Sequence, residues 1–565
     1  MRKHLNDPRK ILLFILLIGA FLRFYKFNWG DGFFFHPDER NIAFGISNLN
    51  LEKGQFNPEF WAYGSLPIYI IYLIAWVADK LPIIKTTLLD FNTYILIGRL
   101  ISALASTLII FLIYKLVLRI LHKNARREKF ALLAALLVAF LPGMIQFAHF
   151  MTFETFLTLE YIVMLWLSFN IVENGRSRDY LLLGIVAGLS VGTKIVSLSV
   201  LPILIAAHVG YSIRNNRQAK HPTLTMIFNK NILLALIVVP VFTFVASPFH
   251  VLDLKGFVNS FNYESGVADG SLLVFYTQQF LETTPVIYQL TKVFPYILTM
   301  PLTLLSIISL CYIPYRSIRV LLRRVRKRRL SLFAIESSLV VLMALLYLAF
   351  HLSLFVKWTR YMIPALPFLV MAVTVVISQV HKKTQLLAKL LIVIVSVWAI
   401  GSGVYFFQIY LKPDTRVESA NWANTNLATN ALVSSEIYDL GIMPFNSVFN
   451  PSNIDLLPLY DLEVNPQKLE AEDSFADSQY FIELSQRVWR TRERLFYMYP
   501  ESNAIYTKLR DPSAKYGWQQ IMRDDRLIAD CNIFTLYCFN NTLTPDETFT
   551  VFDHPTLRIY ENIYR

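Results

Sequence analysis

Long apolar runs separated by short charged stretches dominate the first 411 residues of the chain. A helix that crosses a membrane needs about 20 mostly apolar residues, within a range of roughly 17–25. The pattern therefore predicts a polytopic α-helical membrane protein with about 11 spans. We expect these spans at residues 11–27, 93–118, 130–148, 153–171, 180–193, 195–212, 230–248, 294–313, 332–355, 361–380 and 388–410.

One further apolar run, residues 66–78, has only about a dozen residues, a length typical of an interfacial or re-entrant helix. If it does not cross and the N-terminus is cytoplasmic, the basic loops all lie on the cytoplasmic side, as the positive-inside rule requires. We therefore expect a cytoplasmic N-terminus in a cell membrane, with residues 11–27 retained as the first span because no cleavage site follows them. The basic loops are residues 115–129, 173–179, 214–220, 316–329 and 381–383.

The hydrophobic pattern changes at residue 412, after which apolar and polar residues alternate at short range. We predict a helix, a turn and a strand within residues 417–442, strands at 477–484 and 549–560, and a helix at 485–500. The chain thus divides into a membrane domain, residues 1–411, and an extracytoplasmic α/β domain, residues 412–565. The membrane domain has a first outer loop, 28–92, and a long outer segment, 249–293.

Composition supports this division. Only 16% of the residues are charged, against about 25% in soluble domains, and 55% are hydrophobic. The net charge of +13 combines −8 in residues 412–565 with +21 before them. The basic excess is typical of cytoplasmic loops, and no nucleic-acid recognition module accompanies it. In the acidic domain, Cys531 and Cys538 either form a disulfide or remain reduced.

Charged side chains from distant loops are predicted to meet at the outer membrane surface. Charged groups at a hydrocarbon boundary are costly and tend to be functional. The group consists of His36, Asp38 and Glu39 in the first outer loop, His149 and Glu154 in the second, Lys194 at the outer end of a helix, and Lys357 and Arg360 before the tenth span. Each also has a structural interpretation. The first-loop acids could cap a helix near Asn41, Glu154 could be a surface acid, and the basic residues could be interfacial anchors or snorkelling side chains.

Together these residue types suit one kind of chemistry. A carboxylate beside the membrane can act as general base on an alcohol or amine. Lysine and arginine can bind a phosphate, arginine with two parallel hydrogen bonds. The set favours a donor whose lipid chain stays in the bilayer while its phosphate-linked head group reacts at the surface. The chain has no GxGxxG or phosphate-loop motif, so a soluble nucleotide donor is not indicated.

Several motifs carry a family resemblance in their order along the chain. They are HPDE (36–39), YGSLPIY (63–69), GRLISALAS (98–106), HFMTFE (149–154), GTK (192–194) and RYMIPALPF (360–368), followed by tail motifs such as VFDHPTLRIY (551–560). With these motifs the chain resembles the phospholipid-carrier-dependent glycosyltransferases of the protein O-mannosyltransferase-like group, which have the GT-C membrane fold.

The resemblance implies transfer of a sugar, with inversion, from a polyprenyl-phosphate donor to an extracytoplasmic acceptor, which could be a protein hydroxyl, a glycan or a lipid. By motif match, Asp38 is the expected general base with Glu39 as its neighbour, and Glu154 occupies the position of a second-loop acid. Lys194 and Arg360, with Lys357, are expected to face the donor phosphate. Supporting positions are His36, His149, Tyr63 and Tyr361.

Other functions compete with this interpretation. A transporter or flippase for a lipid-linked glycan would place polar groups through the bilayer midplane rather than at one face. A second alternative is a related transferase that moves an aminosugar to a lipid acceptor. A third is a polymer ligase, which would prefer a polyprenyl-diphosphate glycan donor. The sequence leaves metal use open, since Asp38, Glu39 and Glu154, with His36, could bind a hard divalent cation through oxygen atoms.

Overall fold

The computed structural model describes residues 7–81, 89–215, 229–324, 331–437, 442–464, 468–524 and 544–565. The chain divides into two compact units, which are described one at a time. The helical unit comprises Met1–Phe27, Asp38–Ser265 and Pro285–Phe407. The sheet unit comprises Asn28–Pro37, Gly266–Thr284 and Gln408–Arg565. The predicted boundary between residues 411 and 412 therefore lies close to a unit boundary, but the sheet unit also takes in pieces of both outer loops.

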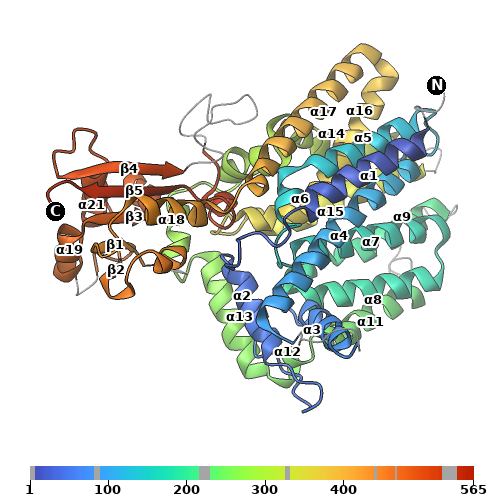
Figure 1. Cartoon of the computed structure of the whole chain (residues 1–565). Coiled ribbons are helices and arrows are strands. Elements are labelled where there is room, and N and C mark those ends of the chain that lie inside the picture. The colour runs from blue at the N-terminus through green and yellow to red at the C-terminus, as the bar shows by residue number, and fades with distance from the viewer. Residues whose placement is uncertain are drawn as a thin grey trace. The chain divides into compact units, whose positions relative to one another are not determined.

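The helical unit is built from apolar helices that run beside one another (Figure 1). They are α1 (Pro8–Phe24), α2 (Pro37–Ser47), α3 (Leu66–Asp79), α4 (Phe91–Ile120), α5 (Arg127–Phe140), α6 (Pro142–Gln146), α7 (Glu154–Asn174), α8 (Ser177–Thr193), α9 (Pro202–Asn215), α11 (Lys230–Ala246), α12 (Phe249–Leu252), α13 (Leu254–Asp269), α14 (Met300–Arg324), α15 (Leu332–Leu352), α16 (Leu366–Lys383) and α17 (Gln385–Phe407). A 3₁₀ turn, Thr359–Ala365, leads into α16.

Seven helical segments among the described residues are long and apolar enough to cross a membrane, so the chain is a multi-pass membrane protein. Each of the predicted apolar runs falls on a helix. However, α1, α5, α8 and α11 have 17, 14, 17 and 17 residues, and α3 has 14. The count of 11 spans and the interfacial placement of residues 66–78 remain predictions. The seven segments are Phe91–Ile120, Glu154–Asn174, Ile195–Asn215, Pro295–Val320, Leu332–Leu352, Thr359–Lys383 and Gln385–Leu411.

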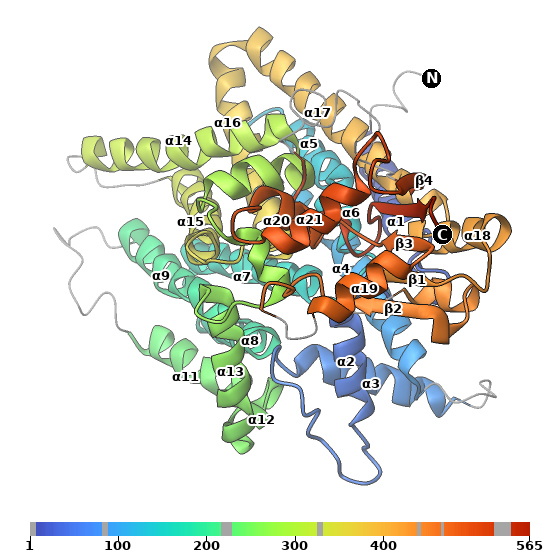
Figure 2. The ribbon, with the colours of Figure 1, turned by 90° about the vertical axis from the view of Figure 1, so that its left-hand side faces the viewer.

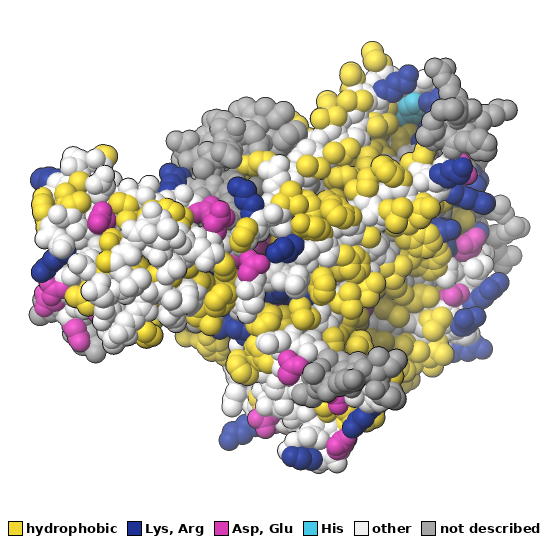
Figure 3. Space-filling model, in the orientation of Figure 1, with side chains coloured by type: hydrophobic (Ala, Val, Ile, Leu, Met, Phe, Trp, Pro, Cys, Tyr) yellow, Lys and Arg dark blue, Asp and Glu magenta, His cyan; other side chains and the backbone are white. Residues whose placement is uncertain are grey.

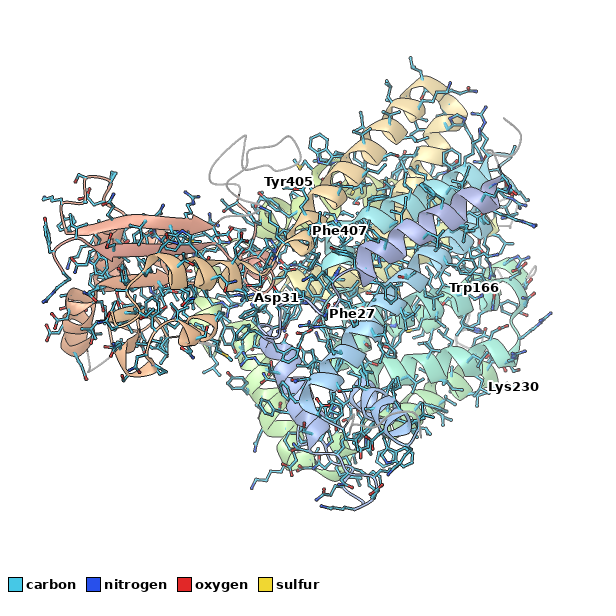
Figure 4. All side chains as sticks on the ribbon, in the orientation of Figure 1. Phe27, Asp31, Trp166, Lys230, Tyr405 and Phe407 are labelled. Atoms are coloured by element: carbon cyan, nitrogen blue, oxygen red, sulfur yellow. The ribbon has the colours of Figure 1, made fainter. Side chains whose placement is uncertain are left out.

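The surface of the helical unit is mostly apolar along its helices, and basic side chains gather at the end where α1 begins (Figure 3). Trp166 of α7 and Lys230 at the start of α11 are labelled at this end in Figure 4. Here Arg119 joins three helices, because it donates to Asn170 at 2.6 Å, Glu173 at 2.9 Å and Glu336 at 3.1 Å. A basic end of this kind is what the positive-inside rule predicts for a cytoplasmic face.

Small residues let α8 and α11 pack closely. Gly184, Gly188 and Gly192 lie at intervals of four on α8, so they form one face of the helix. A Cβ added at Gly188 would lie 2.5 Å from the Val239 carbonyl oxygen of α11, and one at Gly184 would lie 2.8 Å from the Ala235 carbonyl oxygen. Such close approach of backbones is typical of small-residue faces between membrane helices.

The sheet unit has a five-stranded sheet with the order β2-β1-β3-β5-β4. β1 pairs in parallel with β2 and β3, aligning Val433 with Ile454 and Tyr480, whereas β5 is antiparallel to β3 and β4. Two cores result: α18 packs on one face of the sheet, and α19 and α21 pack on the other (Figure 2). The elements are α18 (Thr415–Asn426), β1 (Val433–Glu436), β2 (Ile454–Leu457), α19 (Lys468–Asp477), β3 (Tyr480–Glu483), α20 (Trp489–Arg494), α21 (Pro500–Leu509), β4 (Trp518–Asp524), α22 (Glu547–Thr550) and β5 (Leu557–Asn562).

The structure confirms the helix–turn–strand prediction in residues 417–442 and the strand at 477–484. The strand predicted at 549–560 is wrong in its first part, because Asp546 accepts from the Thr548 amide at 3.1 Å and starts α22. The helix predicted at 485–500 is reduced to α20, and Pro500 opens α21, where its missing N–H group is tolerated. The predicted choice between a disulfide and reduced thiols at Cys531 and Cys538 lies outside the described residues.

Candidate active site

Four predicted site residues lie at the ends of helices that share one end of the helical unit. Asp38 is in the first turn of α2, Glu154 begins α7, Lys194 follows the last residue of α8, and Arg360 lies in the turn before α16. This end is opposite the basic end, since α7 runs from Glu154 toward Asn170 and Glu173 of the Arg119 cluster.

A close junction of loops fixes the positions of these residues. The Gly64 amide donates to the Thr193 carbonyl oxygen at 3.0 Å, and a Cβ at Gly64 would lie only 1.8 Å from the Gly192 carbonyl oxygen. Ser247 strengthens the junction, because its hydroxyl donates to the Gly192 carbonyl oxygen at 2.9 Å and accepts from the Ser65 amide at 2.6 Å. Only glycine fits at position 64, and the junction places Tyr63 beside the end of α8.

Asp38, Arg360 and Tyr63 form one hydrogen-bonded group. The Arg360 guanidinium forms an ion pair with the Asp38 carboxylate. The Tyr63 hydroxyl donates to Asp38 Oδ2 at 3.2 Å and accepts from Arg360 Nη1 at 3.0 Å. The side chains of Asp38 and Arg360 are each 20% exposed, so the pair remains accessible to a ligand.

Glu154 and Lys194 form a second pair beside the first. Lys194 Nζ lies 3.1 Å from Glu154 Oε1, and it also lies over the rings of Tyr63, at 4.9 Å, and Tyr361, at 5.3 Å. Tyr63 therefore contacts members of both pairs. The second carboxylate oxygen of Glu154 is buried and has no hydrogen-bond partner among the described residues. It can therefore accept one further hydrogen bond, for example from a ligand.

Aromatic rings complete the walls of the cluster. The guanidinium of Arg360 lies 4.4 Å from the ring centre of Trp358 and 5.6 Å from that of Tyr361. Such cation–π contacts hold a cation in place without neutralising its charge. Burial raises the pKa of Tyr63 well above its ordinary value, so its phenol stays a neutral hydrogen-bond donor.

Glu264 of α13 belongs to the same electrostatic environment, although it is not among the residues predicted from the sequence. Burial raises the pKa of Glu264; the cations Arg360 and Lys194 oppose that rise, and Asp38 adds to it. No local motif marks Glu264, although it is the single acid between residues 254 and 268 of the long outer segment. A third carboxylate thus lies within electrostatic range of the two ion pairs.

Glu39 lies next to Asp38 in sequence but faces a different partner. Its fully buried carboxylate accepts from Arg99 Nε at 2.8 Å and Arg99 Nη2 at 2.6 Å, and from the Met151 amide at 2.6 Å. It therefore ties α2 to α4 and to the loop before α7. Arg99 lies in the GRLISALAS motif, so the motif contained a signal for this ion pair.

Two other predicted residues, Lys357 and His149, have environments of their own. Lys357 is buried and donates to the Phe355 carbonyl oxygen at 2.5 Å, and burial lowers its pKa to about 8. The His149 ring nitrogens lie 2.8 Å from the Ile145 carbonyl oxygen and 3.0 Å from that of Tyr25. These contacts hold both side chains in place, and their roles in the site remain predictions.

His36 belongs to the sheet unit, where its ring stacks on that of Phe552 at 4.0 Å. Nearby, Arg416 lies 3.5 Å from the ring centre of Phe35, and the Asp414 amide donates to Asp31, labelled in Figure 4, at 3.0 Å. The described part of the chain contains no cluster of three or more His, Cys, Asp or Glu side chains suited to a metal ion. In particular, Glu39 faces Arg99, so the set of Asp38, Glu39 and Glu154 is not assembled.

The fold and the cluster define a multi-pass helical membrane protein with paired acids and bases at one end. Residues 83–244 match a family described as dolichyl-phosphate-mannose-protein mannosyltransferase. This confirms the resemblance inferred from the motifs over that part of the chain. The matched residues include Glu154, Lys194 and Arg99 but neither Asp38 nor Arg360. None of the curated proteins matches the chain in sequence.

Among solved structures, the oligosaccharyltransferase of Archaeoglobus fulgidus, in complex with Zn and sulfate, is similar with a TM-score of 0.44 and 12% identity, covering 98% of this chain and 88% of that one. ArnT from Cupriavidus metallidurans bound to undecaprenyl phosphate is similar with a TM-score of 0.45 and 14% identity, covering 86% of this chain and 94% of that one. These are distant likenesses.

Proposed function

We propose that this protein is a membrane glycosyltransferase that transfers a sugar from a polyprenyl-phosphate donor to an acceptor outside the cytoplasm. The observation that carries the proposal is the meeting of Asp38, Arg360 and Tyr63 with Glu154 and Lys194 at one end of a membrane helix bundle. The family match over residues 83–244 supports the same class of donor.

In this reaction the acceptor oxygen attacks C1 of the sugar while the bond from C1 to the phosphate oxygen breaks. Asp38 takes the proton from the acceptor hydroxyl as general base. Polyprenyl phosphate leaves with the bonding electrons, and Arg360 and Lys194 stabilise its negative charge. Attack opposite the leaving group inverts the configuration at C1.

The ion pairs imply that donor binding and base activation are linked. Both cations already have carboxylate partners, so a donor phosphate competes with Asp38 for Arg360 and with Glu154 for Lys194. Arginine binds phosphate with two charge-assisted hydrogen bonds. When Arg360 turns to the phosphate, Asp38 loses the positive neighbour that favours its ionised form and becomes a stronger base.

The decisive experiment uses the purified protein in lipid with a panel of radiolabelled polyprenyl-phosphate sugars. Wild type is expected to consume one donor, while Asp38→Asn consumes none. Glu52→Gln is the matched control, since it changes an exposed acid of the same loop that pairs with Lys80 at the surface. If Asp38→Asn turns over donor as fast as wild type, another residue is the general base. If wild type consumes no donor but moves the lipid between leaflets, the protein is a transporter and the proposal is wrong.

A further inference from the structure

An exposed apolar stripe on α13 is not used by the proposed chemistry. Leu254, Val258 and Phe261 lie at positions i, i+4 and i+7, so they share one face of the helix. Their exposed fractions are 58%, 42% and 44%. On the opposite face, a Cβ at Gly256 would lie 2.8 Å from the Trp61 ring, so that face packs against the loop before α3. The helix is therefore amphipathic, and none of the residues that the structure describes covers its apolar face.

The helices that precede α13 in the chain also expose apolar side chains. Ile237, Val241 and Val245 of α11 are 64%, 51% and 61% exposed and lie at intervals of four residues. Two residues separate α11 from α12, whose Val251 and Leu252 are 62% and 65% exposed. The labels in Figures 1 and 2 show α11, α12 and α13 following one another at one edge of the helical unit.

We propose that the stripe of Leu254, Val258 and Phe261 lies in the bilayer, at the interface on the side of the candidate active site. A lipid surface is the occupant that the exposed apolar side chains of three consecutive helices favour, because the exposed face of an apolar membrane helix is expected to face lipid. An isolated patch of this kind on a water-exposed helix would mark a protein partner instead.

Charge indicates how the helix binds the membrane. Around the stripe, Lys255 is accompanied by Asp253 and Glu264, so the segment has no basic cluster. Binding through anionic lipids needs such a cluster, with each Lys or Arg near the surface contributing. The stripe is therefore held by apolar contact, and its depth does not depend on salt or on anionic lipid. Three residues after Phe261, the same helix bears Glu264, whose carboxylate interacts electrostatically with Arg360 and Lys194.

A nitroxide scan tests this proposal without reference to sugar transfer. Single cysteines at positions 254, 258 and 261, and at the exposed control Asn259 on the polar side, are labelled in a chain whose Cys311, Cys531 and Cys538 are replaced by serine. The protein is reconstituted in phosphatidylcholine vesicles, and collision rates with oxygen and with a water-soluble nickel chelate are measured. At positions 254, 258 and 261 we expect a high collision rate with oxygen and a low one with the nickel chelate. At position 259 we expect the opposite. Neither result should change in 1 M salt or when anionic lipid is added.

Three outcomes overturn the proposal. If the nickel chelate collides equally with all four positions, the stripe faces water. If the stripe labels are immobilised without spin–spin broadening, the stripe packs against another part of the protein. Immobilised labels with spin–spin broadening indicate a second copy of the chain. If the cysteine-free chain does not fold, Phe261→Trp and Asn259→Trp in the natural background replace the scan. Quenching by brominated phosphatidylcholine is then expected to increase for F261W relative to wild type, and equal increases for both variants contradict lipid contact.

Discussion

At the residue scale, Arg360 has two competing partners, because the guanidinium that pairs with Asp38 is also the proposed ligand of the donor phosphate. Replacing it with alanine removes two charge-assisted hydrogen bonds to the phosphate, but forming these also costs the ion pair with Asp38. The expected net loss is then about 1.5–3 kcal/mol, the contribution of one such bond. We therefore expect Arg360→Ala to weaken donor binding by about 10–100-fold, and Arg360→Lys by less, since lysine keeps the charge but loses the paired donors.

The measurement is the apparent donor affinity in the reconstituted assay, with Arg178→Ala as the control. Arg178 is an exposed arginine at the start of α8, at the other end of the same helix from Lys194. An Arg360→Ala protein with unchanged donor affinity would remove Arg360 from the phosphate site.

A second residue-scale prediction concerns Glu39 and Arg99, which are both fully buried. Removing one partner of a buried ion pair leaves an uncompensated charge and costs about 3–5 kcal/mol. We expect Glu39→Ala to lower the thermal unfolding temperature strongly. The double variant Glu39→Ala, Arg99→Met should recover much of the loss, because it removes both charges. A double variant that is less stable than the single one would contradict this account.

These residues also show what could be predicted from sequence. Asp38, Glu154, Lys194 and Arg360 were placed at one membrane face because hydropathy and loop charge define which helix ends lie together. Their pairing could not be predicted, since it depends on side-chain directions. The Arg99 partner of Glu39 and the approach of Glu264 are contacts between distant segments, and no local pattern encodes them.

At the scale of elements, the glycine face of α8 sets how closely α11 can approach. Gly188→Leu inserts a side chain where a Cβ alone would lie 2.5 Å from the Val239 carbonyl oxygen. Overpacking of this kind costs about 1–3 kcal/mol, and more where backbone must move. We expect reduced thermal stability in detergent for Gly188→Leu, and little change for Leu181→Ala, which alters a partly exposed position of the same helix. Equal stability of the two variants would mean that α8 and α11 do not pack through this face.

The strands of the sheet unit contain a buried acid with consequences for stability. Burial raises the pKa of Glu436, at the end of β1, to about 8, and Tyr506 donates to its carboxylate at 2.5 Å. A folded pKa above the ordinary value of 4.5 means that stability is fully present below about pH 4.5. As the pH rises, the unfolded chain loses its proton first, so stability falls progressively toward pH 8.

Glu436→Gln should remove most of this pH dependence, because glutamine stays neutral and can still accept from Tyr506. Hydrogen–deuterium exchange of peptides covering β1 and β3, corrected for intrinsic rates, is expected to show less protection at pH 8.5 than at pH 5 in wild type. The variant should differ little between the two pH values. Equal protection of wild type at pH 5 and pH 8.5 would show that Glu436 does not titrate between these pH values.

At the scale of the whole molecule, the prediction concerns sidedness. Residues 412–565 follow a span whose preceding loop is basic, so the positive-inside rule places them outside. In sealed right-side-out vesicles, protease added from outside should cleave this segment while the loop at residues 316–329 stays intact. Cleavage of that loop with protection of the C-terminal segment would reverse the topology.

The architecture was largely predictable because apolar runs mark membrane helices whatever their tertiary contacts. The limits of this signal appear at α1, α5, α8 and α11, where helix length alone does not decide whether the helix spans. Pattern reading was weakest in the sheet unit, where α22 replaces the first part of an expected strand through a single capping aspartate. The inclusion of residues 28–37 and 266–284 in that unit depends on contacts made far along the chain.

The pairing of Arg360 with Asp38 and of Lys194 with Glu154 has a consequence for discrimination between ligands. Neutralised cations create little attractive field, and Glu264 adds a further negative charge when it is ionised. Soluble phosphates and sugar nucleotides therefore gain little from approaching the cluster through water. A donor confined to the bilayer reaches the same cluster at a high local concentration, which lets it compete with the carboxylates. If the proposed donor is correct, we expect the resting ion pairs to favour a bilayer-bound donor over a water-soluble one.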